Sequence, residues 1–197
     1  MNYGEYLCII ILCIILLIIF LYLRREYNDI TYVKSDIDDQ LYLVRNLPDK
    51  QQSANLLATI KKNMFKLTEH LNNNKDQFKD FIPYIKQLNN NIQHVSLMES
   101  SENSIYTSYS VNKGEEIVFC LRSRTNKNKI HDLNLIMYVV LHEMSHVACP
   151  EYGHGDLFKK IFAFIATQAI KIGLYTKIDF FNQPTEYCGM VVSDSII

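Results

Sequence analysis

The sequence predicts an α+β fold, in which a small, mainly antiparallel sheet packs against helices, preceded by one apolar N-terminal helix. Three observations support this prediction. An uncharged run opens the chain from Tyr6 to Leu23, apolar residues recur at helical spacing from about Asp49 to Leu71, and the pattern changes to period two from Ile92 to Ser123. The remaining chain is long enough for one domain with its own core.

The opening run is the first element. Its length is near the ~17–25 residues that cross a bilayer, and it lacks the positive n-region and the cleavage site of a signal peptide. We therefore expect an uncleaved transmembrane helix in residues 1–28 and a second domain in residues 29–197. Glu5 precedes the run and Arg24–Arg25 follow it, which predicts a single-pass membrane protein with residues 29–197 on the cytoplasmic side.

The elements after the anchor alternate between strands and helices. Ile30–Val33 and Leu41–Val44 are rich in β-formers and predict a hairpin, followed by the helix to Leu71. A second helix is expected from about Lys75 to Leu88, with Pro83 leaving its end open. This part of the chain shows no set of metal ligands. His70 and His94 stand alone, as structural or solvent-facing histidines do.

Three strands are expected next. They cover Gln93–Leu97, Ser104–Ser110 and Glu116–Leu121, and Asn112-Lys113-Gly114 forms the turn between the last two.

The sequence motif that carries chemistry is His142-Glu143-Met144-Ser145-His146, an HExxH motif among uncharged neighbours. Residues i and i+4 share one face of a helix, so the two imidazoles can converge on one metal ion at about 2.0–2.1 Å, the distance that zinc prefers. Glu143 then reaches a metal-bound water as general base. The alternative to a metal site is a chance match of the motif. Asp132 is the expected N-cap of this helix.

A catalytic zinc site needs a third protein ligand and an open position for water. The helix should end at Cys149-Pro150, because proline disfavours helical geometry in the residue before it. His154 stands between two glycines in the following turn and is the predicted third ligand. Cys149, Glu151 and Asp156 are within range and remain alternatives.

The chain ends with a broad apolar helix and an irregular tail. The helix is expected from Gly155 or Asp156 to about Gly173, packed against the metal-binding helix. The tail contains one possible strand at Met190–Val192. Tyr187-Cys188-Gly189 would place a phenol or a thiol at the cleft, where a tyrosine hydroxyl stabilises an oxyanion; simple packing is the alternative.

These residues resemble a known family. HExxH, a Gly-His after a short loop, and Asp156-Leu157-Phe158 opening another apolar helix are similar to WLM and SprT-like zincin metalloproteases. The resemblance covers about Gly114 to Gly173 and departs from many WLM sequences in the longer spacing from His146 to His154. The chain also resembles predicted WLM-type metallopeptidases of large DNA viruses.

The resemblance implies a zincin-like domain and a membrane-anchored metalloendopeptidase that hydrolyses peptide bonds through a water activated by Zn²⁺. The ligands would be His142, His146 and His154, with Glu143 as the catalytic base. In zincins the strand equivalent to Glu116–Leu121 borders the cleft and would receive substrate backbone by β-augmentation, or would be an ordinary sheet strand. The alternatives are a DNA-associated protease that cuts crosslinked proteins and an inactive zincin scaffold in a membrane.

Charge and cysteine usage limit the possible partners. The chain has 197 residues and a net charge of −1, so no overall electrostatic attraction draws it to nucleic acid or anionic lipid. We expect a protein or peptide substrate and the membrane as partners, and nucleic acid binding is not expected. Outside the apolar run the cysteines are Cys120, Cys149 and Cys188, an odd number that predicts reduced thiols. The sequence leaves the oligomeric state open.

Overall fold

The computed structural model describes residues 3–126 and 128–197, except for the side chains of residues 5 and 22–28. The predicted orientation in a membrane rests on Glu5, Arg24 and Arg25, which therefore lie outside the described side chains.

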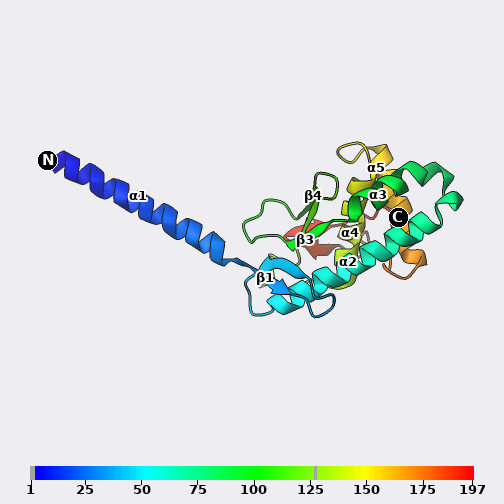
Figure 1. Ribbon diagram of the computed structural model, residues 1–197, viewed down its shortest axis with the longest axis horizontal. Helices are drawn as coiled ribbons and strands as arrows, with labels where there is room; N and C mark the ends of the chain where they lie inside the picture. The colour runs from blue at the N-terminus through cyan, green and yellow to red at the C-terminus, as the bar shows by residue number, and fades with distance from the viewer. Residues whose placement is uncertain (1–2, 127) are drawn as a thin grey trace.

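Helix α1 (Tyr3–Asn28) extends away from the rest of the molecule (Figure 1). Crossing a bilayer takes about 20 consecutive apolar residues. Among the described residues, no helix combines the length and the apolarity that crossing requires. This finding contradicts the transmembrane helix in the predicted fold, and it also contradicts the predicted single-pass membrane location.

A mixed sheet forms the base of the rest of the molecule. In the part of the chain that the structure describes, it has five strands in the order β1-β2-β3-β5-β4. β1–β2 and β4–β5 are antiparallel, as expected for hairpins, whereas β2–β3 and β3–β5 are parallel. The prediction of a mainly antiparallel sheet is therefore wrong. The strands are Ile30–Lys34 (β1), Leu41–Arg45 (β2), Ser96–Glu99 (β3), Ser108–Val111 (β4) and Glu116–Phe119 (β5).

The strand order corrects a second expectation. The strand expected to border the cleft is β5, and it lies inside the sheet with β3 on one side and β4 on the other. Among the described residues the two edges of the sheet are β1 and β4, and β4 is the edge next to β5. An added strand can hydrogen-bond only to a free edge, so β4 takes the place of β5 as the candidate substrate strand.

In the described part of the chain after α1, four helices pack on the sheet and on one another, and their apolar faces form the core. Pro83 lies in the first turn of α3, where its missing N–H costs nothing, so the predicted helix from Lys75 is wrong at its start. Two short 3-10 turns, at 75–77 and 79–81, precede it. The helices are Lys50–Asn73 (α2), Ile82–Ile92 (α3), Leu133–Ala148 (α4) and Asp156–Lys171 (α5).

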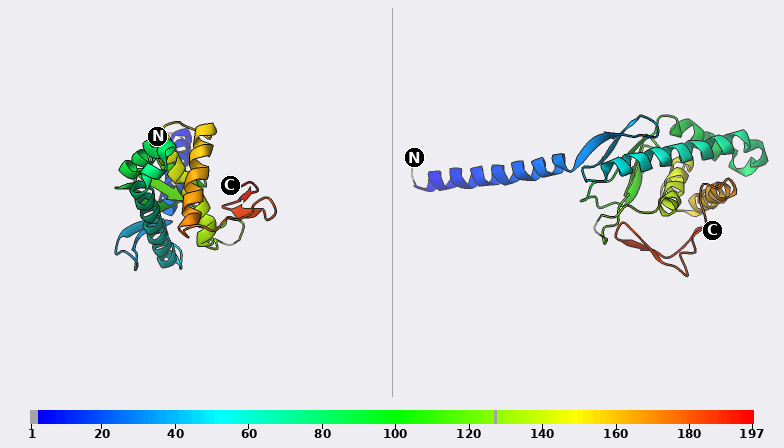
Figure 2. Two further views of the ribbon diagram at one scale, coloured as in Figure 1. Left: turned by 90° about the vertical axis from the view of Figure 1, so that its right-hand side faces the viewer. Right: turned by 90° about the horizontal axis from the view of Figure 1, so that it is seen from below.

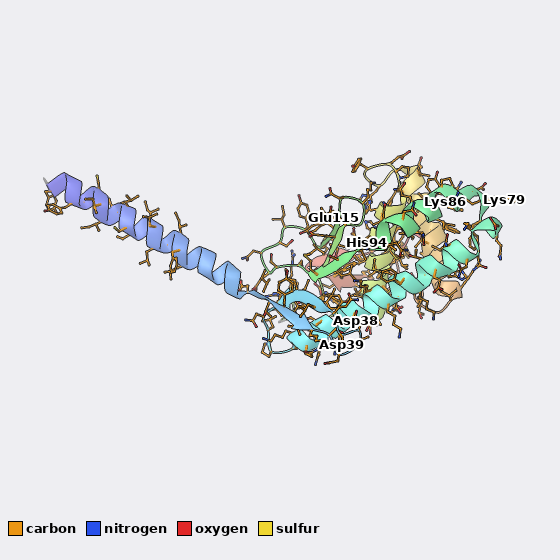
Figure 3. The ribbon with its side chains drawn as sticks, viewed as in Figure 1. Asp38, Asp39, Lys79, Lys86, His94 and Glu115 are labelled. Atoms are coloured by element: carbon orange, nitrogen blue, oxygen red, sulfur yellow. A yellow bond between two sulfur atoms is a disulfide. The ribbon has the colours of Figure 1, made fainter. Side chains whose placement is uncertain are left out.

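The outer surface carries charged side chains, among them five residues labelled in Figure 3 together with His94: Asp38, Asp39, Lys79, Lys86 and Glu115. His94 is exposed, in agreement with a solvent-facing histidine.

The C-terminal tail forms a second, two-stranded sheet from β6 (Thr185–Tyr187) and β7 (Met190–Val192). This hairpin lies on the side of α4 that faces away from α2 (Figure 2, right). A disulfide between Cys120 and Cys188 joins the tip of the hairpin to the end of β5. The prediction of reduced thiols is therefore wrong for this pair, and the buried Cys149 remains free.

Candidate metal centre and cleft

Helix α4 carries the HExxH motif. The side chain of Asp132 accepts a hydrogen bond from the backbone N–H of Asn134 at 2.8 Å, so the predicted N-cap is confirmed. The helix ends at Ala148, just before Cys149-Pro150 as expected. Its apolar side chains are buried on almost all sides, which fixes the direction in which His142 and His146 point.

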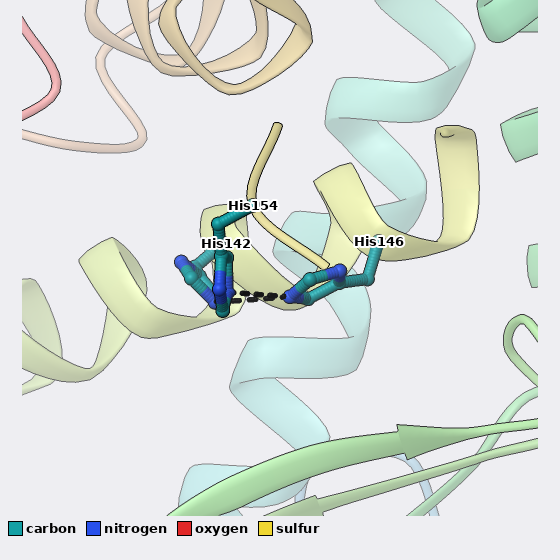
Figure 4. A group of neighbouring side chains, drawn as sticks. All are labelled: His142, His146 and His154. Carbon is teal, nitrogen blue, oxygen red and sulfur yellow. Dashed lines mark hydrogen bonds between the residues drawn. The ribbon is translucent and has the colours of Figure 1, made fainter. Parts of the chain in front are cut away.

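Three imidazoles converge at this helix. His142 and His146 lie one turn apart on α4, and His154 comes from the loop before α5 (Figure 4). The Nε2 atoms of each pair are 3.1 Å apart. An ion about 2.0–2.1 Å from all three nitrogens fits such a triangle and keeps an outward position for a fourth ligand. These residues therefore fit a tetrahedral metal ion with one open position.

The other candidates for a third ligand lie apart from this cluster. Cys149, Glu151 and Asp156 are all described by the structure, and the group of potential ligands consists of the three histidines without them. Cys149 is fully buried, whereas Glu151 and Asp156 are exposed.

The aromatic ring of Phe158 contacts all three imidazoles. The ring of Phe158, on α5, stacks on His146 at 4.3 Å between centroids and lies edge-on to His142 at 5.0 Å and to His154 at 4.8 Å. The sequence predicted Phe158 at the start of the last apolar helix, but it did not predict this contact with the histidines. A sequence feature could have predicted the contact, because Phe158 lies two residues into the helix that directly follows the Gly-His loop.

Burial and mutual repulsion favour the neutral form of the two helix histidines, His142 and His146. Burial, followed by repulsion from His146 and His154, lowers the pKa of His142 to about 3. Burial, followed by repulsion from His154 and Lys113, lowers the pKa of His146 to about 4. Neutral imidazole is the form that binds a metal ion.

Glu143 is a buried carboxyl group beside the triad. Its side chain is almost inaccessible, at 4% exposure, and burial raises its pKa to about 7. A carboxyl group with a pKa close to neutral pH is suited to exchange protons with a reacting molecule.

Two adjoining cavities form a cleft along β4 and share Ser108, His142, Glu143 and His154. The more polar of the two, here called the polar cavity, has a volume of about 390 Å³ and continues along β4 toward Asn112 and Lys113. The apolar cavity, of about 370 Å³, extends the other way from Thr107, and its walls include four side chains from α4 and the C-terminal hairpin: Val139, Tyr187, Met190 and Val192.

Tyr187 reaches this cleft from the C-terminal hairpin. Its hydroxyl lies 2.8 Å from the hydroxyl of Ser108 at the start of β4. Burial raises the pKa of Tyr187, so the phenol keeps its proton at neutral pH. The Nε2 atom of His131 accepts a hydrogen bond from the backbone N–H of Cys188 at 3.2 Å, so His131 helps to hold the same hairpin.

Comparison with known proteins places the chain among viral relatives. No protein-family model matches it. The structure is similar to the crystal structure of Wss1 from Saccharomyces cerevisiae, with a TM-score of 0.49 and 20% identity over 66% of this chain and 90% of that chain. The sequence is 25% identical over 168 residues to the uncharacterized protein 136R of Invertebrate iridescent virus 6, covering 80% of this chain and 87% of that protein.

A protein of another virus is more similar to this chain in sequence. The chain is 44% identical over 180 residues to the uncharacterized protein R325 of Acanthamoeba polyphaga mimivirus, covering 91% of each protein. The expected resemblance to viral proteins is confirmed by this match. With such identity over almost the whole length, the chain belongs to the same protein family as mimivirus R325.

Proposed function

We propose that this protein is a zinc-dependent metalloendopeptidase. The observation that carries the proposal is the convergence of three imidazoles beside a buried carboxyl group in a cleft that runs along a sheet edge. The resemblance of the HExxH and Gly-His residues to WLM and SprT-like zincins supports the same function.

The three histidines would hold the metal through Nε2. A zinc ion bound there supplies Lewis-acid polarisation and lowers the pKa of a coordinated water to about 7. Glu143 accepts the proton of the attacking water and later donates it to the leaving amine. Its burial limits access of bulk water to the carboxyl group, and in the metal-free chain that burial raises its pKa to about 7.

The substrate backbone would pair with β4. This strand is the sheet edge beside the triad, and Ser108, Tyr109 and Ser110 line the cleft. Backbone hydrogen bonds hold an added strand independently of its sequence, and the cavities contact its side chains. Tyr187, which stays protonated, donates a hydrogen bond to the oxygen of the peptide bond under attack.

The test is Glu143→Gln in the full chain. The amide has nearly the same size as the carboxyl group but cannot accept the water's proton, so zinc binding should persist. Cleavage of an unfolded protein should fall by at least about 10²-fold, because general-base catalysis contributes about 10²–10⁴-fold.

The matched control is Glu69→Gln, the same change at an exposed site on α2, which should retain parental activity. Zinc per chain is measured by elemental analysis alongside proteolysis. If the Glu143 variant cleaves as fast as the parent, or if the parent binds no zinc, the proposed function is wrong.

A further inference from the structure

Pro150 removes one of the backbone donors available at the C-terminus of α4. A carbonyl in the last turn of a helix is usually left without a partner, and here proline removes one possible donor. In a continued helix the carbonyl of His146 would accept from the residue at position 150, which is Pro150 and has no N–H. Donors must therefore come from other parts of the chain.

Lys113, in the turn between β4 and β5, supplies them. Its Nζ donates to the backbone carbonyl of His146 at 3.3 Å, of Cys149 at 2.8 Å and of Glu151 at 2.9 Å. An ammonium group has three N–H donors, so the three carbonyls match its full capacity. Its positive charge also lies at the negative end of the helix dipole.

These contacts extend beyond the helix into the loop that carries His154. Cys149 and Glu151 lie outside α4, and the ring of Tyr152 packs against Lys113 with Nζ 4.5 Å from its centroid. Lys113 thus holds the chain on both sides of Pro150, up to two residues before His154.

The turn that carries Lys113 is itself seated on α4. Gly114 has φ +111°, and a Cβ there would meet Cγ1 of Val147 at 3.0 Å. A glycine is therefore required both by the backbone conformation and by the close approach to the helix. The turn that carries Lys113 therefore lies directly against the end of α4.

Gln87 offers a comparison within the same molecule. Its Nε2 donates to the carbonyl of Val147 at 2.9 Å, so it also caps the end of α4. That bond ends on a helical residue, whereas the bonds of Lys113 reach the loop as well. The two side chains therefore separate helix capping from loop positioning.

We propose that Lys113 is the positioning residue for the third metal ligand: it ties the β4–β5 turn to residues 149–152 and so holds His154 against the other two histidines. This inference rests on the proposed metal site. It adds a residue of the β4–β5 turn to the machinery of the centre, through His154 rather than by contact with the metal.

The experiment measures zinc affinity of the full chain by competition with a chelating dye. Lys113→Met keeps much of the length of the side chain and removes all three hydrogen bonds, and we expect zinc binding to weaken by about 10–100-fold, as for other residues that orient a ligand. The cobalt-substituted variant should show a changed d–d absorption. Gln87→Leu should leave both readouts as in the parent, even where its melting temperature falls.

A double variant shows through which residue Lys113 acts. In a His154→Ala background, Lys113→Met should weaken zinc binding no further, because the ligand that it positions is already absent. An equal loss in both backgrounds, or unchanged affinity in Lys113→Met, would overturn the proposal.

Amide hydrogen exchange gives a readout that needs no metal. Exchange at residues 151–154 should accelerate in Lys113→Met and not in Gln87→Leu, and equal exchange in the two variants would contradict the positioning role. A parent chain that binds no zinc but shows this difference would refute the metal site and the peptidase proposal, while the contact of Lys113 with the loop of His154 would stand.

Discussion

The hydroxyls of Tyr187 and Ser108 lie 2.8 Å apart and join the C-terminal hairpin to the first residue of the edge strand. The two residues come from different sheets and are far apart in the sequence, yet both line the apolar cavity beside Glu143. This contact places a protonated phenol at the wall of the proposed active site.

Tyr187→Phe removes that hydroxyl and keeps the ring that packs in the core. We expect kcat to fall by about 10²-fold with little change in KM, since loss of one oxyanion donor costs about 10²–10³-fold in rate. Steady-state cleavage of a fluorogenic peptide measures both constants. Tyr32→Phe, at an exposed tyrosine, is the control. A rise in KM with constant kcat would instead indicate a purely structural role.

The two cavities predict cleavage specificity. β4 runs from the apolar cavity at Thr107 toward the polar cavity at Asn112. In antiparallel pairing, the slightly more stable arrangement, the peptide after the cleaved bond lies along the apolar cavity. We expect an apolar residue directly after that bond.

Mapping the cleavage sites in a peptide library by mass spectrometry checks this expectation. Val139→Asp should weaken the preference by placing a charge in the cavity wall. An apolar preference before the bond would mean that the peptide binds parallel to β4.

The histidine pair predicts how the stability of the metal-free protein depends on pH. The folded pKa values of His142 and His146, about 3 and about 4, lie below the ordinary value of 6.5. Between those values the unfolded chain binds more protons, so the free energy of unfolding decreases as pH falls from about 6.5 to 4. Urea denaturation in the presence of a chelator measures this loss, and it should be smaller in His142→Phe. If the free energy of unfolding depends equally on pH in parent and variant, the lowered pKa of His142 is not the cause of the loss.

Glu143 predicts the opposite dependence of stability on pH. Its folded pKa of about 7 lies above the ordinary 4.5, so the folded protein holds the extra proton in that range and loses stability as pH rises through it. Metal-free Glu143→Gln should therefore be more stable than the parent at pH 8, by on the order of 1–3 kcal/mol, with the difference shrinking below pH 4.5. Urea denaturation of the two metal-free proteins checks this difference in stability. A variant less stable than the parent at pH 8 would contradict the raised pKa of Glu143.

Local features of the site were readable from the sequence. The i, i+4 spacing of His142 and His146 placed two rings on one face, and Pro150 indicated the end of α4. Asn112-Lys113-Gly114 predicted the hairpin turn, because Gly114 takes a positive φ that other residues rarely adopt. These features depend on neighbours within a few residues.

Features that depend on distant pairing were not readable. β3 pairs with β5 rather than with the next strand in the chain, so the period-two pattern could not show that β4 is an edge. The 68-residue separation between Cys120 and Cys188 likewise leaves no local trace. The position of His154 beside the other two histidines was predicted from the turn that carries it, whereas the contacts of Lys113 with that turn come from another element and were not predicted.

The prediction of a transmembrane helix from the apolar N-terminal run was wrong for a different reason. Its composition alone suggested a membrane span, whereas no helix of the described residues meets the requirements for crossing a bilayer. The positive-inside argument depended on that span and fails with it.

The disulfide makes the segment from Cys120 to Cys188 a closed covalent ring, and His142, Glu143, His146 and His154 all belong to it. If the protein cleaves itself at one bond within the ring, the two pieces stay linked through sulfur. Such a nicked molecule would migrate close to the intact chain on a denaturing gel without reductant and would separate into fragments only after reduction.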